Sequence, residues 1–287
     1  MEDEKNIKVV VLIMVYQERL SDWEKISLIQ GINLLKDYPI RIVKPLSLKK
    51  LELPVDQELI STESFPDKYF EHIGTYSRLL LSLEFYKRFK QFEYVLIYQL
   101  DAFVFKNELA DWCLKDYHYI GAPWFEDYSS DNNDAALIGL GNGGFSLRNV
   151  SAHLRVLQSF SYLSPPKENW KRRMKDSPKG FKLVRQVGGF LLDLTVRNNT
   201  FWLLNSFMGF EDQFWSLVAP KNFKWFKIAD VREAMNFSIE MQPRRVYTMN
   251  NNQLPFGCHA WWKYDLEFWK PHIERFGYRL PNNEPGS

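Results

Sequence analysis

An aspartate at the end of an apolar run is the residue of this sequence whose position most clearly suggests chemistry. Tyr94 to Tyr98 are apolar, β-branched and aromatic residues, which favour a buried strand, and Gln99 and Asp101 follow directly. A carboxylate among apolar side chains is costly unless it is paired or binds a cation. Ligands of α/β proteins bind at the carboxyl ends of the strands. Asp101 is therefore a candidate cation ligand; the alternative is that it caps a turn or pairs with an arginine.

Two adjacent carboxylates form a second candidate. Glu211 and Asp212 follow Gly209 inside the aromatic stretch from Phe207 to Trp215. The glycine predicts a turn into a helix, whose N-terminus stabilises negative charge. One interpretation is a general base or a ligand of a substrate hydroxyl, and the other is plain helix capping.

A histidine and an arginine complete the set of isolated candidates. His259, one of five histidines, lies in a turn-rich segment from Leu254 to Lys263, either as a ligand or as a structural residue between aromatics. Arg78 lies beside the apolar stripe of a helix predicted from Gly74 to about Phe89. It is either a surface residue or a clamp for an anion such as phosphate.

A glycine-rich segment and a basic segment lie between these candidates. Gly139 to Gly144 holds four glycines in six residues, which allows close backbone approach or positive φ. Its spacing fits neither a Walker loop nor a dinucleotide fingerprint. Residues 164–185 hold eight lysines and arginines. They form either a solvated face or a docking surface for an anionic membrane or a diphosphate-linked acceptor.

The elements that must position these residues follow a β-α-β order at the start of the chain. Lys8 to Val15 predicts a buried strand, and Ser21 to Glu24 has the form of a capping box that opens a helix. Pro39 ends that helix, and a second strand begins at Ile40. This pattern is typical of a parallel α/β sheet. Further strands are predicted at 94–98, 117–120 and 145–147, and helices at 107–113 and 150–160.

Composition narrows the class of protein. The 287 residues are 45% hydrophobic and 16% aromatic, and the formal charge of +2 gives no nucleic-acid signature. Two cysteines are too few for a disulfide framework. We expect a single domain over 8–280, with halves 8–124 and 125–280, a mobile loop at 125–134, a tail at 1–7 and a disordered tail at 281–287. No leader or transmembrane run is evident, which predicts a cytoplasmic protein.

The order of motifs resembles the metal-dependent GT-A glycosyltransferases, and most closely the bacterial glycosyltransferase-like DUF5672 family. The resemblance extends from about Val9 to Trp269. It rests on six motifs: Thr75-Tyr-Ser-Arg78-Leu, Tyr98-Gln-Leu-Asp101, Tyr119-Ile-Gly-Ala-Pro-Trp124, Gly141-Asn-Gly-Gly-Phe-Ser-Leu-Arg148, Glu211-Asp-Gln-Phe-Trp215 and Pro255-Phe-Gly-Cys-His-Ala-Trp261.

This resemblance implies a fold and a set of site residues. The fold is α/β of the GT-A type, with a mixed, mostly parallel central sheet flanked by helices. Asp101, His259 and Gln99 match the positions that hold Mn²⁺ or Mg²⁺, and Gln99 departs from the usual carboxylate of the D-x-D motif. The donor would contact Arg78, Tyr76, Gln99, Asp101, Gly143 and Gly144. Asp212 or Glu211 would be the catalytic base.

The implied function is transfer of a sugar from a nucleotide-diphosphate sugar, with a UDP-sugar expected, to a glycan or lipid-linked acceptor in surface polysaccharide synthesis. An inverting outcome is expected, with Asp212 slightly preferred as base. No nucleic-acid partner is expected, and residues 164–185 could bring the protein to the inner face of a membrane. The alternatives are a non-catalytic nucleotide-sugar or glycan-binding protein of the same fold, and a nucleotide-sugar hydrolase.

Overall fold

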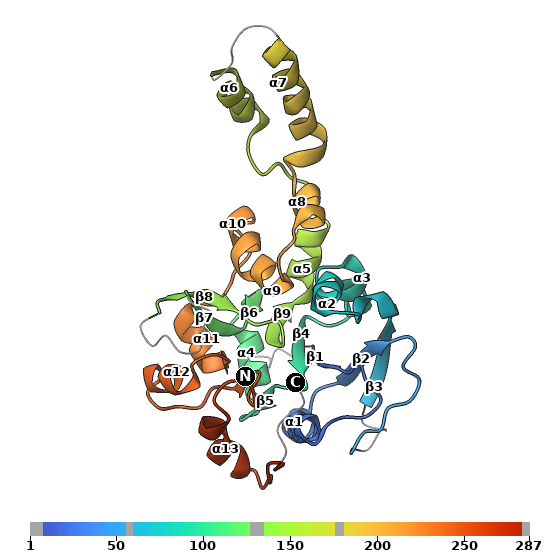
Figure 1. Ribbon diagram of the computed structural model, residues 1–287, viewed down its shortest axis with the longest axis vertical. Helices are drawn as coiled ribbons and strands as arrows, with labels where there is room; N and C mark the ends of the chain where they lie inside the picture. The colour runs from blue at the N-terminus through green and yellow to red at the C-terminus, as the bar shows by residue number, and fades with distance from the viewer. Residues whose placement is uncertain (1–7, 56–59, 127–134, 176–180, 283–287) are drawn as a thin grey trace, which may run out of the picture.

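A six-stranded mixed sheet forms the centre of the molecule (Figure 1). The structure, a computed structural model, describes residues 8–55, 60–126, 135–175 and 181–282. The strands lie in the order β3-β2-β1-β4-β9-β6. Their bounds are β1 Val9–Met14, β2 Ile40–Pro45, β3 Ile60–Phe65, β4 Tyr94–Gln99, β6 Tyr119–Ile120 and β9 Phe145–Asn149.

Strand direction explains where the ends of the strands meet. Strands β3, β2, β1 and β4 run parallel, and β9 runs antiparallel to both β4 and β6. The register places Met14, at the end of β1, beside Gln99, at the end of β4. Both strands are buried over their apolar residues, as continuous apolar strands of parallel sheets usually are. The polar residues that follow them therefore come together at the carboxyl ends of these two strands.

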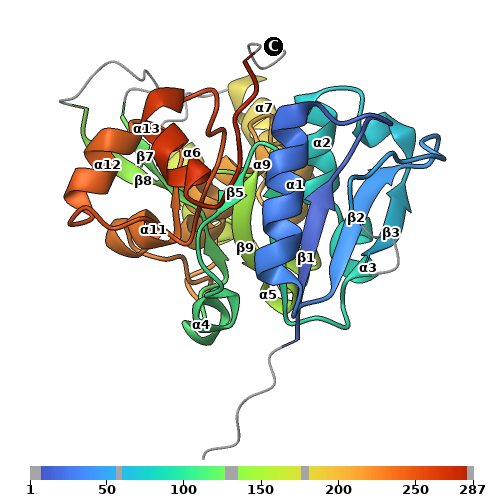
Figure 2. The same ribbon diagram turned by 90° about the horizontal axis from the view of Figure 1, so that it is seen from below.

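Helices cover both faces of this sheet (Figure 2). Helix α1, Asp22–Leu35, lies on one face, and α2 Ile73–Leu80, α3 Leu83–Arg88 and α5 Val150–Leu157 lie on the other (Figure 1). Ser21 caps α1 and Glu24 completes the capping box, as the sequence predicts. The Tyr98 ring packs against Gly31 of α1 and its hydroxyl donates to the carbonyl of Ser27, which fixes the helix on the strand.

A smaller lobe packs beside the end of the sheet. It contains the three-stranded sheet β10-β11-β5 and the hairpin β7-β8, with a second apolar cluster around buried Trp261 and Trp269. The bounds are β5 Phe103–Val104, β7 Ala122–Phe125, β8 Leu137–Gly141, β10 Ser238–Ile239, β11 Gly257–Cys258, α4 Leu109–Leu114, α9 Glu211–Gln213, α10 Ala219–Asn222, α11 Val231–Phe237, α12 Pro243–Met249 and α13 Leu266–Glu274.

A helical arm projects from the rest of the molecule along its longest axis (Figure 1). It consists of α6 Pro166–Lys175, α7 Phe181–Leu192, a π-helical turn over Asp193–Arg197, and α8 Thr200–Ser206. Trp170 of α6 and Phe190 of α7 hold the first two helices together, with ring centroids 4.8 Å apart. We refer to residues 166–206 as the helical arm.

The structure confirms the predicted α/β class and the mixed, mostly parallel sheet with flanking helices. One predicted helix is wrong: the segment from Gly74 to Phe89 forms two helices, because the Ser82 side chain accepts from the N–H of Phe85 and starts α3. Residues 1–7, 127–134 and 283–287 lie outside the described residues, so the predicted tails and most of the predicted loop are not tested. Within the described residues, no helix is both long and apolar enough to cross a membrane.

Candidate functional site

Asp101 lies directly after β4, where two positive groups face its carboxylate. The His259 Nε2 atom is 3.0 Å from Oδ1, and the Lys263 Nζ atom is 2.9 Å from Oδ2. The carboxylate is only 12% exposed. Burial acts to raise the pKa of Asp101, but His259 and Lys263 more than offset this and hold it well below its usual range. The carboxylate is therefore ionised at neutral pH.

His259 lies between two carboxylates. Its Nδ1 atom is 2.8 Å from Glu240 Oε1, and its Nε2 atom faces Asp101 and, at 3.2 Å, the amide oxygen of Gln99. Burial acts to lower the pKa of His259, but the attraction and hydrogen bonding of Asp101 and Glu240 raise it to about 10. An Nε2 atom that faces two oxygen acceptors needs a proton or a metal ion between them, so this cluster selects for a positive charge.

These residues fit a divalent cation. Nε2 of His259, a carboxylate oxygen of Asp101 and the amide oxygen of Gln99 converge, and Glu240 binds the other ring nitrogen, as is usual for a metal-bound histidine. Among the described residues, no three His, Cys, Asp or Glu side chains form a metal-binding group. A metal here therefore needs the Gln99 amide as its third protein ligand, and one charged ligand predicts modest affinity.

Two neighbouring glycines separate this cluster from the acidic pair. A Cβ on Gly144 would lie 2.0 Å from Nε2 of His259 and 2.6 Å from Oε1 of Gln99. A Cβ on Gly143 would lie 2.1 Å from Oε1 of Glu211. Both distances are far shorter than van der Waals contact, so neither position has room for any side chain. The glycine-rich segment thus brings the two candidate groups to opposite sides of a single peptide unit.

Glu211 is engaged in a buried ion pair. Its two carboxylate oxygens lie 3.0 Å and 2.9 Å from Nη2 and Nη1 of Arg148, and Arg148 is completely buried. Burial raises the pKa of Glu211 to about 7, although Arg148 acts to lower it. Burial acts to lower the pKa of Arg148, but Glu211 keeps it well above its usual value. The attraction of the guanidinium favours the ionised form of Glu211, and of the two contacts only Nη2 to Oε1 is a hydrogen bond.

Asp212 is differently placed. Its Oδ1 accepts from the N–H of Gln213 at 2.8 Å, and no arginine or lysine of the described residues forms an ion pair with it. Burial and the nearby Glu240 raise its pKa, and backbone hydrogen bonds from Gln213 and Asn142 act in the opposite direction. A carboxylate of raised basicity that forms no ion pair with the described residues suits proton transfer better than one paired with Arg148.

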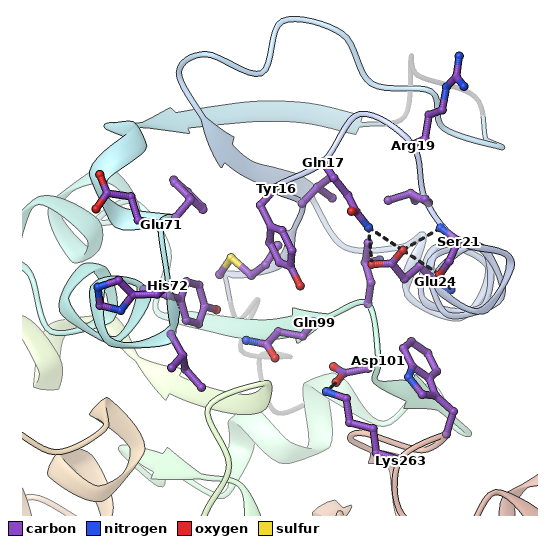
Figure 3. Close-up of a pocket in the computed structure, with 18 residues that line it drawn as sticks. Tyr16, Gln17, Arg19, Ser21, Glu24, Glu71, His72, Gln99, Asp101 and Lys263 are labelled. Atoms are coloured by element: carbon purple, nitrogen blue, oxygen red, sulfur yellow. Dashed lines mark hydrogen bonds and ion pairs between the residues drawn. The ribbon is translucent and has the colours of Figure 1, made fainter. Parts of the chain in front are cut away.

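A cavity of about 920 Å³ opens beside Asp101 (Figure 3). The side chains of Gln99 and Asp101 point into it, Lys263 borders it, and Tyr16 and Gln17 from the end of β1 line its other side. Tyr76 also lines it, and burial raises the pKa of the Tyr76 hydroxyl, against the opposing effect of Gln99. Asp212 is not among the residues that line the cavity.

Arg78 lies apart from this cavity. Its guanidinium donates to the carbonyl of Leu204 at 3.3 Å and to that of Phe207. These contacts tie the end of α8, and with it the base of the helical arm, to α2. The structure thus shows Arg78 holding the backbone that leads to Glu211, and its predicted contact with a donor stays a prediction.

The structure adds three residues that we did not single out from the sequence. Arg148 is in a quoted motif, but its buried contact with Glu211 depends on the pairing of β9 with β4. Lys263 follows His259 by four residues, a spacing that could have signalled a second cation beside Asp101. Glu240 lies next to β10 without a distinctive motif, so no sequence signal identified it.

Comparisons with known proteins agree with the predicted family. The family model described as "Protein of unknown function (DUF5672)" matches residues 59–259, more than half of the chain. No curated protein sequence matches.

Several solved structures resemble the fold at low identity. The galactosyltransferase LgtC, solved with donor and acceptor sugar analogs, gives a TM-score of 0.47 with 10% identity, covering 95% of this chain and 98% of its own. A glycosyltransferase involved in glycosylation of the major capsid of PBCV-1 gives 0.45 with 12% identity, over 93% and 98%. Mouse xyloside xylosyltransferase 1 gives 0.44 with 12% identity, over 87% and 96%. At TM-scores below 0.5 we draw no functional conclusion from these likenesses.

Proposed function

We propose that this chain, which belongs to the DUF5672 family, is a glycosyltransferase that uses a nucleotide-diphosphate sugar as donor. The observation that supports this most is the meeting of Asp101, Gln99, His259 and Lys263 at the carboxyl end of β4, on the border of a cavity of about 920 Å³. This cluster favours a bound positive charge. A cation held there, beside such a cavity, suits a ligand that carries a negatively charged diphosphate.

The leaving diphosphate would lie next to Asp101. Asp101, His259 and Gln99 would hold Mn²⁺ or Mg²⁺, and the imidazole nitrogen favours Mn²⁺. When bound, the ion would offset the negative charge that develops on the leaving group. Lys263, whose side chain is 59% exposed, supplies a mobile ammonium that can leave Asp101 for a phosphate oxygen.

The nucleoside would occupy the other side of the cavity. Tyr16 follows β1, its ring stands in the cavity, and it is 62% exposed (Figure 3). An exposed aromatic ring is a stacking surface for a nucleobase, worth about 1–3 kcal/mol per base. Gln17 donates to Glu24 beside it, at 3.0 Å, which leaves a polar rim that can contact a base or ribose. We expect a UDP-sugar, as the resemblance implies.

Asp212 would remove the proton of the acceptor hydroxyl. Its pKa is raised towards neutral pH, and in the part of the chain that the structure describes it forms no ion pair like that of Glu211 with Arg148. A separate base next to the donor site is what an inverting displacement needs. The acceptor would be a glycan or a lipid-linked oligosaccharide, consistent with surface polysaccharide synthesis.

A donor panel tests the proposal. Purified protein is mixed with UDP-, GDP- and dTDP-sugars and Mn²⁺, and release of the nucleoside diphosphate is measured with and without an oligosaccharide or lipid-linked acceptor. Donor binding is followed separately by saturation-transfer NMR. We expect acceptor-dependent release with one donor, loss of binding in Asp101→Asn, and wild-type behaviour in Asp111→Asn, a matched control whose carboxylate is exposed on α4.

The same experiment separates the two other interpretations. Binding of a donor without any release would identify a non-catalytic nucleotide-sugar-binding protein. Release that does not depend on an acceptor would identify a hydrolase. Absence of binding to every donor would reject the proposed site.

A further inference from the structure

The helical arm exposes an apolar stripe. Val184, Val187, Leu191 and Leu192 occupy positions i, i+3, i+7 and i+8 of α7, which share one face of a helix. Val184 is 70% exposed and Leu191 54% exposed. Phe190, which lies beside the stripe, packs on Trp170 of α6 and holds the helix pair together.

Further exposed apolar side chains follow α7 in the helical arm. Val196 in the π-helical turn and the aromatic residues Phe201 and Trp202 in α8 are also exposed or partly exposed. Isolated exposed apolar residues are common, but a run of them on one projecting element marks an interaction surface. Helices α6 and α7 stand clear of the sheet and the smaller lobe, whereas α8 packs at the base of the arm (Figure 1).

Positive charge is concentrated on the same segment. Residues 166–206 contain nine lysines and arginines and three aspartates and glutamates, a formal charge of +6. Because the whole chain carries +2, the remaining residues carry −4. Lys167 and Lys171 of α6 are both exposed. The arm therefore combines an apolar face with a charge opposite in sign to that of the rest of the chain.

We propose that the helical arm docks on the surface of an anionic lipid bilayer. Helices with an apolar face, aromatic residues and an excess of lysine and arginine bind in the plane of the interface, where apolar burial and attraction to anionic headgroups add. A second copy of the arm fits less well as occupant, because two segments of +6 repel each other. This inference does not rest on the proposed glycosyltransferase activity.

Vesicle flotation of the full-length protein tests the docking. The probes are vesicles of pure phosphatidylcholine and vesicles with 30% phosphatidylglycerol, at about 0.1 M and 0.5 M salt. We expect flotation with the anionic vesicles only, and a marked loss at the higher salt.

Two pairs of matched variants locate the contact. Lys167→Glu/Lys171→Glu in α6 is compared with Lys87→Glu/Lys90→Glu, which reverses two exposed lysines at the end of α3. Each lysine near an anionic surface contributes about a factor of five, so the arm variant should lower the partition coefficient at least about thirtyfold and the control little.

The second pair addresses the apolar stripe. Leu191→Glu should lower the partition coefficient about tenfold or more, because a leucine side chain no longer enters the interface. Leu114→Glu, which changes a leucine of similar exposure at the end of α4, should leave it unchanged. Circular dichroism of each variant confirms that the fold is retained.

Three outcomes would overturn the proposal. The first is equal binding to neutral and anionic vesicles, or none to either. The second is anionic binding that both arm variants leave intact. The third is a dimer in light scattering that Leu191→Glu dissociates, which would assign the stripe to contact between copies of the chain.

Discussion

Of the two adjacent carboxylates of α9, Glu211 should contribute to stability and Asp212 to activity. Glu211 forms an ion pair with fully buried Arg148, and among the described residues Asp212 forms none. Glu211→Gln keeps the size of the side chain but removes its charge. The variant therefore leaves the positive charge of Arg148 buried and uncompensated. We predict that this substitution destabilises the protein, while Asp212→Asn does not.

The size of the effect follows from the burial of the pair. Breaking one partner of a buried ion pair costs about 3–5 kcal/mol, because the remaining charge keeps its desolvation penalty. For a chain of this length, 1 kcal/mol corresponds to about 2 °C in Tm, so Glu211→Gln should lower Tm by about 6–10 °C. Asp212 is partly buried, and desolvation together with repulsion from Glu240 already disfavours its charge. Asp212→Asn should therefore leave Tm unchanged or raise it slightly.

Activity should respond in the opposite way. Removing a general base lowers kcat about 10²–10⁴-fold, so Asp212→Asn should retain donor binding and lose acceptor-dependent turnover. Glu211→Gln, assayed well below its Tm, should keep a substantial part of kcat. Differential scanning calorimetry and the assay of nucleoside diphosphate release provide the two readouts for each variant.

A double-mutant cycle checks that the ion pair is the cause. Arg148→Met alone leaves Glu211 buried without a partner, whereas Arg148→Met/Glu211→Gln removes both charges. The double variant should therefore lose much less stability than the sum of the two single variants. Additive losses would show that Arg148 and Glu211 act independently, and an equal fall in Tm for Asp212→Asn would refute the division of roles.

Three further predictions concern the cation site, the glycine pair and a buried histidine. Mn²⁺ at about 100 times its Kd should stabilise the wild type by about 2.7 kcal/mol and leave Asp101→Asn unaffected in thermal unfolding; equal stabilisation of both would place the ion elsewhere. Gly144→Ala should cost about 1–3 kcal/mol and weaken donor binding, because the added Cβ meets His259 Nε2 at 2.0 Å. Gly139→Ala, whose nearest atom would be 3.8 Å away, is the control in both assays. His153 is packed against Tyr86 and Trp215, and burial holds its pKa well below the usual value. Stability linked to His153 is therefore present above pH 6.5 and lost as the pH falls, by up to about 1.4 kcal/mol per pH unit. In urea titrations between pH 7 and 5, His153→Phe should show a shallower decline than the wild type; parallel declines would contradict the assignment.

Local patterns were sufficient to predict β1, α1 and β2, whereas β3 was not predicted. The apolar run before Val15, the capping box at Ser21 and the proline at 39 each act over a few residues, and β1, α1 and β2 form as expected. The break between α2 and α3 was missed because the apolar stripe continues through it, and only the Ser82 cap interrupts the helix.

The site itself was predictable in part. Asp101 stood out because a carboxylate after an apolar strand is costly, and the structure shows it between His259 and Lys263. The ion pair that distinguishes Glu211 from Asp212 could not be predicted. It depends on Arg148, which reaches Glu211 only when β9 pairs antiparallel with β4 and α9 docks against the sheet.

The separation of the cation-site residues along the chain has a consequence for biosynthesis. Gln99 and Asp101 meet their partners 160 and 162 residues later in the sequence, at His259 and Lys263. A nascent polypeptide that ends before these residues has an unneutralised carboxylate at the edge of its newly formed sheet. Contacts between such distant residues form late in folding because the loop between them must close first. The proposed cation site is therefore complete only after residues as far as Lys263 have been synthesised, and a product truncated before β11 would lack His259 even if its first strands had folded.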